Sequence, residues 1–239
     1  MTITSPHNEK LKTLRKLRQR RRDRDRLGQF VAEGEDLLAA ADGAGWTPVE
    51  RFAVSGSGLP GLEVDAAALR SVSDLASGTR TLAVYHERWE AVPLGPLCVY
   101  LHGVSDPGNV GTVLRSAAAF GASCVALGPG SADPFSPKAV RASMGAIFVV
   151  PVVRVTPEGL PGVTVALDAG AERSLAQVVA ELPPGGDVSL LIGAERPGLP
   201  AEVTAAADHA ARIPIATESL NAAIATSVAL YELSRQPST

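Results

Sequence analysis

The chain has 239 residues, of which 46% are hydrophobic and 20% are charged, a balance typical of a folded globular protein and not of a disordered one. At this length it can bury a large core in one or two domains. No apolar run is long enough to cross a membrane, and the charged N-terminus lacks the apolar core of a secretion signal. We therefore expect a cytoplasmic protein without a membrane segment, disulfide framework or metal site, in which Cys98 and Cys124 are buried in strands.

Positive charge is concentrated near the N-terminus. Residues 8–26 include ten lysines or arginines and three acids, which gives +7, whereas the remainder has twelve basic and twenty-two acidic residues, which gives −10. This segregation predicts contact with a nucleic acid and binding that weakens steeply with salt. The alternative is a solvated helix whose basic face contacts nothing. The candidate RNA-binding residues are Lys10, Lys12, Arg15, Arg18, Arg20, Arg21, Arg22 and Arg24.

The first predicted helix covers residues 9–20, because leucines recur there at helical spacing on one side. The following segments alternate between strand and helix patterns and predict a small α/β domain. A connector rich in Pro and Gly follows it, so we place the boundary there and assign residues 1–92 to one domain and 97–239 to another, each with its own core. The expected elements are a strand from Phe30 that turns at Gly34 into a helix through Ala41, strands at 51–54 and 81–86, and a helical turn at 66–71.

Beyond residue 97, apolar runs alternate with helical stretches. Strands that are apolar throughout and have helices between them predict a parallel sheet covered on both faces. Ligands of such sheets bind beyond the carboxyl ends of the strands. The six predicted strands are 98–101, 124–127, 147–153, 164–167, 190–192 and 212–215.

A glycine-rich loop follows the first of these strands, between Gly103 and Arg115. Its glycines allow tight turns and close approach to a ligand, and Asn109 is predicted to open the helix that carries Arg115. The loop lacks the Gly-Lys-Ser/Thr ending of a nucleoside-triphosphate site and the Gly-x-Gly-x-x-Gly of a dinucleotide site. His102 is expected to pack at the strand end.

Two further loops, at 193–200 and 213–221, also place short polar residues after a strand. In the second, Ser219 is predicted to be the N-cap of the C-terminal helix. For that segment alone, a capped helix with no ligand would be sufficient explanation. Because three such loops follow strands of one parallel sheet, we expect them to share an edge and form a binding site.

Three motifs carry a specific resemblance. They read Asp106-Pro-Gly-Asn-Val-Gly-Thr-Val-Leu-Arg-Ser-Ala, Ile192-Gly-Ala-Glu-Arg-Pro-Gly-Leu and Ile213-Pro-Ile followed by Ser219-Leu-Asn. In this order and spacing they resemble the signature motifs of the SpoU/TrmH branch of the SPOUT RNA methyltransferases. The basic N-terminal segment is similar to the substrate-binding domain that precedes the catalytic domain in many members.

The resemblance implies an α/β fold whose C-terminal parallel sheet contains a deep trefoil knot. It implies S-adenosyl-L-methionine as the methyl donor, a ribose 2′-hydroxyl of RNA as the acceptor, ribosomal more than transfer RNA as substrate, and a homodimer through the C-terminal domain. It assigns the polar catalytic site to Asn109, Arg115, Glu195, Ser219 and Asn221. It assigns cofactor binding to Gly193, Ala194, Ile213, Ile215, Leu220 and Ala223.

Arg115 holds the place of the arginine proposed in this family to take the hydroxyl proton. A guanidinium is a poor base, so anchoring an RNA phosphate and stabilising the developing alkoxide stay open as its second role. Either role predicts that lysine replaces it badly. Two other function classes are an RNA-binding protein that kept the fold and lost catalysis, and a flavodoxin-like or nucleotide-binding module. The intact polar residues disfavour the first, and the missing phosphate fingerprints disfavour the second.

Overall fold

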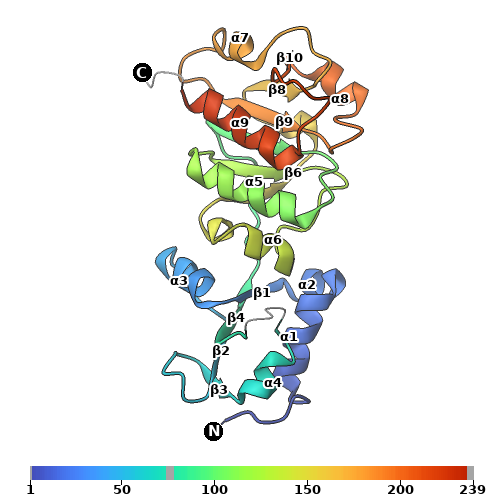
Figure 1. Ribbon diagram of the computed structural model, residues 1–239. Helices are drawn as coiled ribbons and strands as arrows, with labels where there is room; N and C mark the ends of the chain where they lie inside the picture. The colour runs from blue at the N-terminus through green and yellow to red at the C-terminus, as the bar shows by residue number, and fades with distance from the viewer. Residues whose placement is uncertain (1, 74–77, 236–239) are drawn as a thin grey trace.

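The computed structural model describes residues 2–73 and 78–235 and contains two sheets, one in each half of an elongated molecule (Figure 1). The N-terminal sheet has four strands in the order β1-β4-β2-β3, in which β4 is antiparallel to both neighbours and β2 is parallel to β3. Its strands are β1 (Gln29–Glu33), β2 (Glu50–Val54), β3 (Leu62–Val64) and β4 (Thr81–His86).

Four helices accompany this sheet. The leucine stripe of the first is fully buried and packs with Val31, Phe52 and Leu82 of the strands, which confirms the predicted helix. That helix ends where Arg20 turns to an extended conformation, and a second helix, which the sequence analysis did not separate, begins at the next residue. The helices are α1 (Glu9–Gln19), α2 (Arg21–Leu27), α3 (Glu35–Gly43) and α4 (Ala66–Arg70).

The C-terminal sheet has six parallel strands, which confirms the parallel sheet predicted from the apolar runs. Their order is β10-β8-β9-β5-β6-β7. The strands are β5 (Leu97–Leu101), β6 (Cys124–Leu127), β7 (Val152–Arg154), β8 (Val163–Leu167), β9 (Val188–Ile192) and β10 (His209–Ala211). The helices are α5 (Pro107–Ala119), α6 (Pro137–Ala142), α7 (Leu175–Val179), α8 (Ala201–Ala206) and α9 (Ala222–Ser234), with 3-10 turns η1 (Ala146–Phe148) and η2 (Pro157–Gly159).

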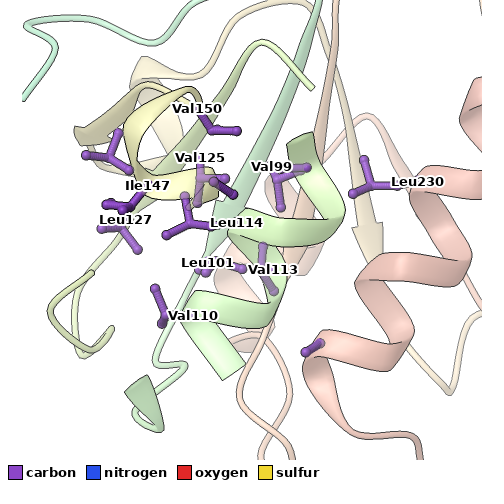
Figure 2. Close-up of a cluster of buried hydrophobic side chains, with 14 of the residues drawn as sticks. Val99, Leu101, Val110, Val113, Leu114, Val125, Leu127, Ile147, Val150 and Leu230 are labelled. Atoms are coloured by element: carbon purple, nitrogen blue, oxygen red, sulfur yellow. The ribbon is translucent and has the colours of Figure 1, made fainter. Parts of the chain in front are cut away.

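Helices α5 and α9 lie side by side on one face of this sheet (Figure 1). The Oγ atoms of Ser116 and Ser227 are 2.7 Å apart between them. Figure 2 shows the apolar cluster beneath, in which Val113 and Leu114 of α5 and Leu230 of α9 face strand residues such as Val99. Burial of this cluster fixes the start of each helix over the carboxyl edge of the sheet.

Two predicted strands are wrong in part. The run 147–153 begins as the turn η1, and β7 starts only at Val152. The chain reverses at Met144 and Gly145, which both have positive φ, so Ile147 and Phe148 are buried in a turn and not in a strand. In the run 212–215, β10 has already ended at Ala211, and Pro214 has no N–H to continue a ladder.

One core cluster spans both halves, so the prediction of separate cores is wrong in part, although the leucine stripe of α1 packs in a second cluster made only of N-terminal residues. Phe30, Trp46 and Tyr85 of the N-terminal half pack in the same cluster as Phe135 and Phe148 of the C-terminal half. The ring centroids of Phe30 and Phe135 are 4.8 Å apart, and those of Trp46 and Phe148 are 5.2 Å apart. The indole N–H of Trp46 donates to the Phe148 carbonyl at 2.8 Å. In the part of the chain that the structure describes, no helix is long and apolar enough to cross a membrane.

Candidate functional site

The three polar loops gather at one edge of the C-terminal sheet. Strand β9 pairs with β5, and β8 connects β9 to β10, so the loops that leave β5, β9 and β10 all start from carboxyl ends of parallel strands. The expectation that they share an edge is therefore confirmed.

Helix α5 opens with Asp106 as its N-cap, not with Asn109 as predicted. The Asp106 side chain accepts from the Gly108 N–H, and its other oxygen lies 2.9 Å from Lys138 Nζ. The hydrogen bond from Lys138 holds the pKa of Asp106 below its usual value. Because Asp106 supplies the cap, the Asn109 side chain is left to bond across to other loops.

Asn221 joins the three motifs. Its side-chain oxygen caps α9 by accepting from the N–H groups of Ala223 and Ile224, so the predicted N-cap at Ser219 is wrong by two residues. Its amide nitrogen donates to Asn109 Oδ1 at 3.1 Å and to Glu195 Oε1 at 3.2 Å. Asn109 Nδ2 also donates to Glu195 Oε1. Glu195 Oε1, in the second motif, thus accepts from the side-chain amides of Asn109 in the first motif and Asn221 in the third.

Arg115 and Ser219 are not hydrogen-bonded into this cluster. Arg115 is exposed on α5, about one and two-thirds turns beyond Asn109, and no hydrogen bond or ion pair joins its side chain to the described residues. Ser219 lies in the exposed loop before α9, where its carbonyl accepts from the Thr217 hydroxyl at 3.4 Å. Ser219 also lines the adjacent cavity.

A cavity of about 750 Å³ opens beside the cluster, between the ends of β8, β9 and β10 and helix α8. Glu195 belongs to the hydrogen-bonded cluster and also lines the cavity. The predicted cofactor residue Ala223 does not line the cavity, because it is only 2% exposed and packs in the hydrophobic core. The predicted cofactor residues that line it are Gly193, Ala194, Ile213, Ile215 and Leu220.

Gly193 is required by a close approach of two backbone segments. A Cβ at this position would lie 2.1 Å from the Gly198 carbonyl carbon and 2.2 Å from the Leu199 nitrogen. The loop returns there because the Gly198 N–H donates to the Ala194 carbonyl at 3.0 Å, with Gly198 at φ 69°. This turn forms one wall of the cavity.

Sequence reasoning missed a further wall at the end of β8. Asp168 follows that strand, and its Oδ1 accepts from the Gly170 N–H at 2.9 Å. The signal was available, since an acidic residue directly follows an apolar strand of the same parallel sheet. It was not used because no signature motif includes that position.

The basic segment divides into exposed and buried residues. Arg18 NH1 lies 2.7 Å from Glu33 Oε2, and two guanidinium nitrogens of Arg24 lie 2.9 and 2.7 Å from Asp133 Oδ2, with all four side chains at most 10% exposed. The prediction that Arg18 and Arg24 contact RNA is therefore wrong for this structure, because their charges are used in buried ion pairs. Those left on the surface or half-buried are Lys10, Lys12, Arg15, Arg20, Arg21 and Arg22.

The remaining candidate residues are structural. Cys98 and Cys124 are buried on paired strands β5 and β6 with sulfurs 3.3 Å apart, and the Cys124 hydrogen bond together with burial raises the pKa of Cys98. His102 Nδ1 lies 3.0 Å from the Tyr100 hydroxyl at the end of β5. Within residues 2–73 and 78–235, no group of three or more His, Cys, Asp or Glu could hold a metal ion.

Comparison with known proteins gives family matches to both halves. Residues 96–231 match the SpoU rRNA methylase family, and residues 8–85 match the MRM3-like substrate binding domain. The chain is 29% identical over 250 residues to the 23S rRNA (guanosine(2553)-2′-O)-methyltransferase RlmP of Bacillus subtilis, covering 97% of this chain and 98% of the relative.

Solved structures extend the likeness to the whole fold. An AdoMet-bound rRNA methyltransferase from Sinorhizobium meliloti superimposes with a TM-score of 0.88 at 31% identity, covering 100% of this chain and 99% of that one. The SpoU methyltransferase AviRb from Streptomyces viridochromogenes, in complex with the cofactor AdoMet, gives 0.84 at 27% identity over 96% and 98%. With its three motifs joined at one sheet edge and more than half of its length matched, the chain belongs to the SpoU rRNA methylase family.

Proposed function

We propose that this protein transfers a methyl group from S-adenosylmethionine to a ribose 2′-hydroxyl of ribosomal RNA. The observation that carries the proposal is the hydrogen-bonded cluster of Asn109, Glu195 and Asn221 at the mouth of a cavity walled by glycine turns. Relatives named as rRNA 2′-O-methyltransferases and a neighbour that binds AdoMet support the same activity.

The cavity fits the cofactor in size and in chemistry. About 750 Å³ is within the usual range for sites of small organic ligands. The close turn at Gly193 and Gly198 offers backbone groups to a polar ligand, while Ile213, Ile215 and Leu220 supply apolar surface for an adenine ring. When bound, S-adenosylmethionine supplies a methyl group on a positively charged sulfur.

The chain contributes alignment and charge stabilisation. Asn109 and Asn221 fix Glu195 through Oε1, which orients this carboxylate toward the ribose hydroxyl. The Glu195 carboxylate would accept the hydroxyl proton as the methyl group passes to the 2′-oxygen and a neutral thioether is left. We assign to Arg115 the stabilisation of negative charge that develops on the 2′-oxygen and contact with an adjacent phosphate, because a guanidinium donates well and accepts protons badly. Its exposure on α5 leaves it accessible to RNA.

A homodimer through the C-terminal domain is part of the proposal. Ile224, Val228 and Tyr231 recur at helical spacing on α9 and are 53%, 40% and 53% exposed. This row of side chains lies beside α5, since the ring centroid of Phe120 at the end of α5 is 6.2 Å from that of Tyr231. Three large apolar side chains in one exposed row favour a protein partner, and a second copy of this face is the simplest one.

Three further expectations accompany the function. We infer a deep trefoil knot around the loops at 193–200 and 213–221 from the family resemblance. We infer a division into an RNA-binding domain at 1–92 and a methyltransferase domain at 97–239, which the ranges of the two family matches support. We infer a cytoplasmic protein, because the substrate of the named bacterial relatives is ribosomal RNA.

The test is direct. Purified protein is incubated with radiolabelled S-adenosylmethionine and with total RNA from a strain that lacks the gene, and 2′-O-methylated positions are then mapped. Label in ribosomal RNA at one site supports the proposal. RNA binding without methyl transfer in the presence of bound cofactor would favour the alternative of an inactive RNA-binding protein.

A further inference from the structure

A second cavity lies on the same edge of the C-terminal sheet, away from the first. It has a volume of about 590 Å³ and opens at the carboxyl ends of β6 and β7. Its walls are the loop 127–134, residues 154–156, Trp89, which follows β4, and Arg21 of α2. None of the three motifs contributes to it.

This cavity adjoins the loop that leads to the proposed catalytic cluster. The Gly103 N–H donates to the Pro129 carbonyl at 2.9 Å, and a Cβ on Gly130 would lie 3.2 Å from Gly103 Cα. The wall of the second cavity therefore touches the start of the loop that becomes α5 and carries Asn109.

One wall is a flat stack of an aromatic ring and a guanidinium. Arg154 Cζ lies 4.0 Å from the centre of the Trp89 ring. Two contacts hold the Trp89 ring in place. Its centroid lies 5.2 Å from that of Phe135 in an edge-to-face arrangement, and its indole N–H donates to Glu87 Oε2 at 2.9 Å. Arg154 is 55% exposed and thus presents its outer face to the solvent. Guanidinium planes and aromatic rings are the surfaces on which unpaired RNA bases stack.

Two arginines at the cavity share one partner. Asp25 lies 3.6 Å from Arg21 Nε and 3.8 Å from Arg154 NH2, and all three side chains are about half exposed. Such exposed pairs are weak, and Glu87, which accepts from the Trp89 indole N–H, is a further acid near Arg154. Asp133 in the same wall is already neutralised by Arg24. The two arginines can therefore exchange Asp25 for a phosphate.

The buried ion pair between Arg24 and Asp133 also determines the position of Arg21. It ties α2 to the loop 127–134, and Arg21, one helical turn earlier, is thereby held at the cavity. Arg20 and Arg22 continue the exposed basic segment from that point. The positive surface of the N-terminal domain thus reaches the catalytic edge of the sheet at this cavity.

We propose that this second cavity binds an unpaired nucleotide of the RNA substrate, next to the nucleotide that is methylated. Its base stacks on the Arg154 and Trp89 pair, and its phosphate is held by Arg21. The inference rests on the proposed function for the identity of the ligand, and it adds a subsite that positions single-stranded RNA at the sheet edge.

The test uses the full chain and an unstructured RNA of about ten nucleotides that contains 4-thiouridine, with a blunt RNA duplex for comparison. Photo-crosslinked peptides are mapped by mass spectrometry. We expect crosslinks from the single strand at Trp89 and in the loop 127–134, and none there from the duplex. Crosslinks confined to other surfaces would overturn the proposal.

Variants separate stacking from charge. Arg154→Ala should weaken binding of the single strand roughly tenfold, and Arg154→Lys should weaken it nearly as much because lysine keeps the charge and loses the plane. Arg80→Ala is the matched control, since Arg80 is 57% exposed, pairs with Glu35 at 3.2 Å and lies outside the cavity. The control should stay within about twofold of the wild type. Equal affinities of wild type and Arg154→Ala would overturn the proposal.

Kinetics distinguish this inference from the function on which it rests. Arg154→Ala should raise KM for RNA more than it lowers kcat, as expected of a positioning residue. If the wild type methylates RNA and Arg154→Ala has unchanged KM and affinity, the subsite is wrong and the proposed function stands. If the wild type binds the single strand through Arg154 and transfers no methyl group, the proposed function is wrong and the subsite stands.

Discussion

Asn221 donates its side-chain amide to Asn109 Oδ1 at 3.1 Å while its side-chain oxygen caps helix α9. One side chain therefore sets the start of a helix and links the first motif to the third. The two roles can be separated, because serine can cap a helix and has no amide to donate to Asn109 or Glu195.

We expect Asn221→Ser to keep the free energy of unfolding within about 0.5 kcal/mol of the wild type and to lose most methyl transfer. Asn221→Ala should lose the same activity and in addition about 1 kcal/mol of stability, because the cap is gone. Denaturant unfolding and a methyl-transfer assay measure the two quantities. Near-normal turnover in Asn221→Ser would show that the link to Asn109 is dispensable.

Arg115→Ala should remove methyl transfer and leave cofactor binding intact. Arg115 is exposed and does not line the cofactor cavity, so its loss affects only substrate or transition-state contacts. We expect turnover to fall by roughly two orders of magnitude or more, with Arg115→Lys nearly as impaired. Calorimetric titration with S-adenosylmethionine and single-turnover assays check both parts. A lysine variant with full activity would show that charge alone is enough.

Gly193→Ala should abolish cofactor binding, since its new methyl group would overlap the backbone of Gly198 and Leu199. For the wild type, S-adenosylmethionine at about 100 times its Kd should add roughly 2.7 kcal/mol of stability, seen as a rise in Tm. The variant should show no such rise. Gly43→Ala is the matched control, because nothing lies within 4 Å of a Cβ there. A normal thermal shift in Gly193→Ala would mean that the cavity does not hold the cofactor.

Changing Arg20 and Arg22 together to Ala should flatten the salt dependence of RNA binding. Both are exposed, and removing two phosphate contacts lowers the slope of log affinity against log salt by roughly 1.5 units. This pair avoids Arg18 and Arg24, whose guanidinium groups form buried ion pairs with Glu33 and Asp133, so that their replacement would also destabilise the fold. Filter binding at several salt concentrations gives the slope. A control with Arg80 and Arg173 changed to Ala, at two other surface ion pairs, should keep the wild-type slope.

Val228→Glu should convert the proposed dimer to a monomer by placing a charge in the exposed apolar row on α9. Light scattering after size-exclusion chromatography gives the mass directly. Val49→Glu, at an exposed valine of the N-terminal half, should leave the mass unchanged. A monomeric wild type, or a Val228→Glu variant that stays dimeric, would rule out this face as the interface.

Much of the architecture could be predicted because it depends on local patterns. The spacing of Leu11, Leu14 and Leu17 determines which side of α1 is buried, and apolar runs separated by helices determine a parallel sheet. Since the loops after parallel strands meet at one edge, the proximity of Asn109 and Glu195 followed from the strand assignment.

Other features depend on contacts between distant segments and could not be predicted. Ser219 and Asn221 are equally good caps by residue type, and only the hydrogen bonds from the Ala223 and Ile224 N–H groups to the Asn221 side chain show which one is used. Arg18 and Arg24 have the same composition around them as the exposed arginines, but their acidic partners are far away in the sequence. The aromatic residues of the shared core are scattered singly along the chain and form no periodic pattern.

That shared aromatic core makes the two halves poor candidates for recombination with relatives. A graft that replaced residues 2–86 would remove Phe30, Trp46 and Tyr85 and leave Phe135 and Phe148 facing water or a mismatched surface. In proteins whose domains are joined by flexible linkers, one domain can be exchanged without disturbing the other. Here, exchange of the N-terminal half for that of a relative with a different RNA specificity would disrupt the shared core. Any exchange of the N-terminal half has to keep an apolar surface that fits Phe135 and Phe148, because the contact between the halves is packed as a protein interior is.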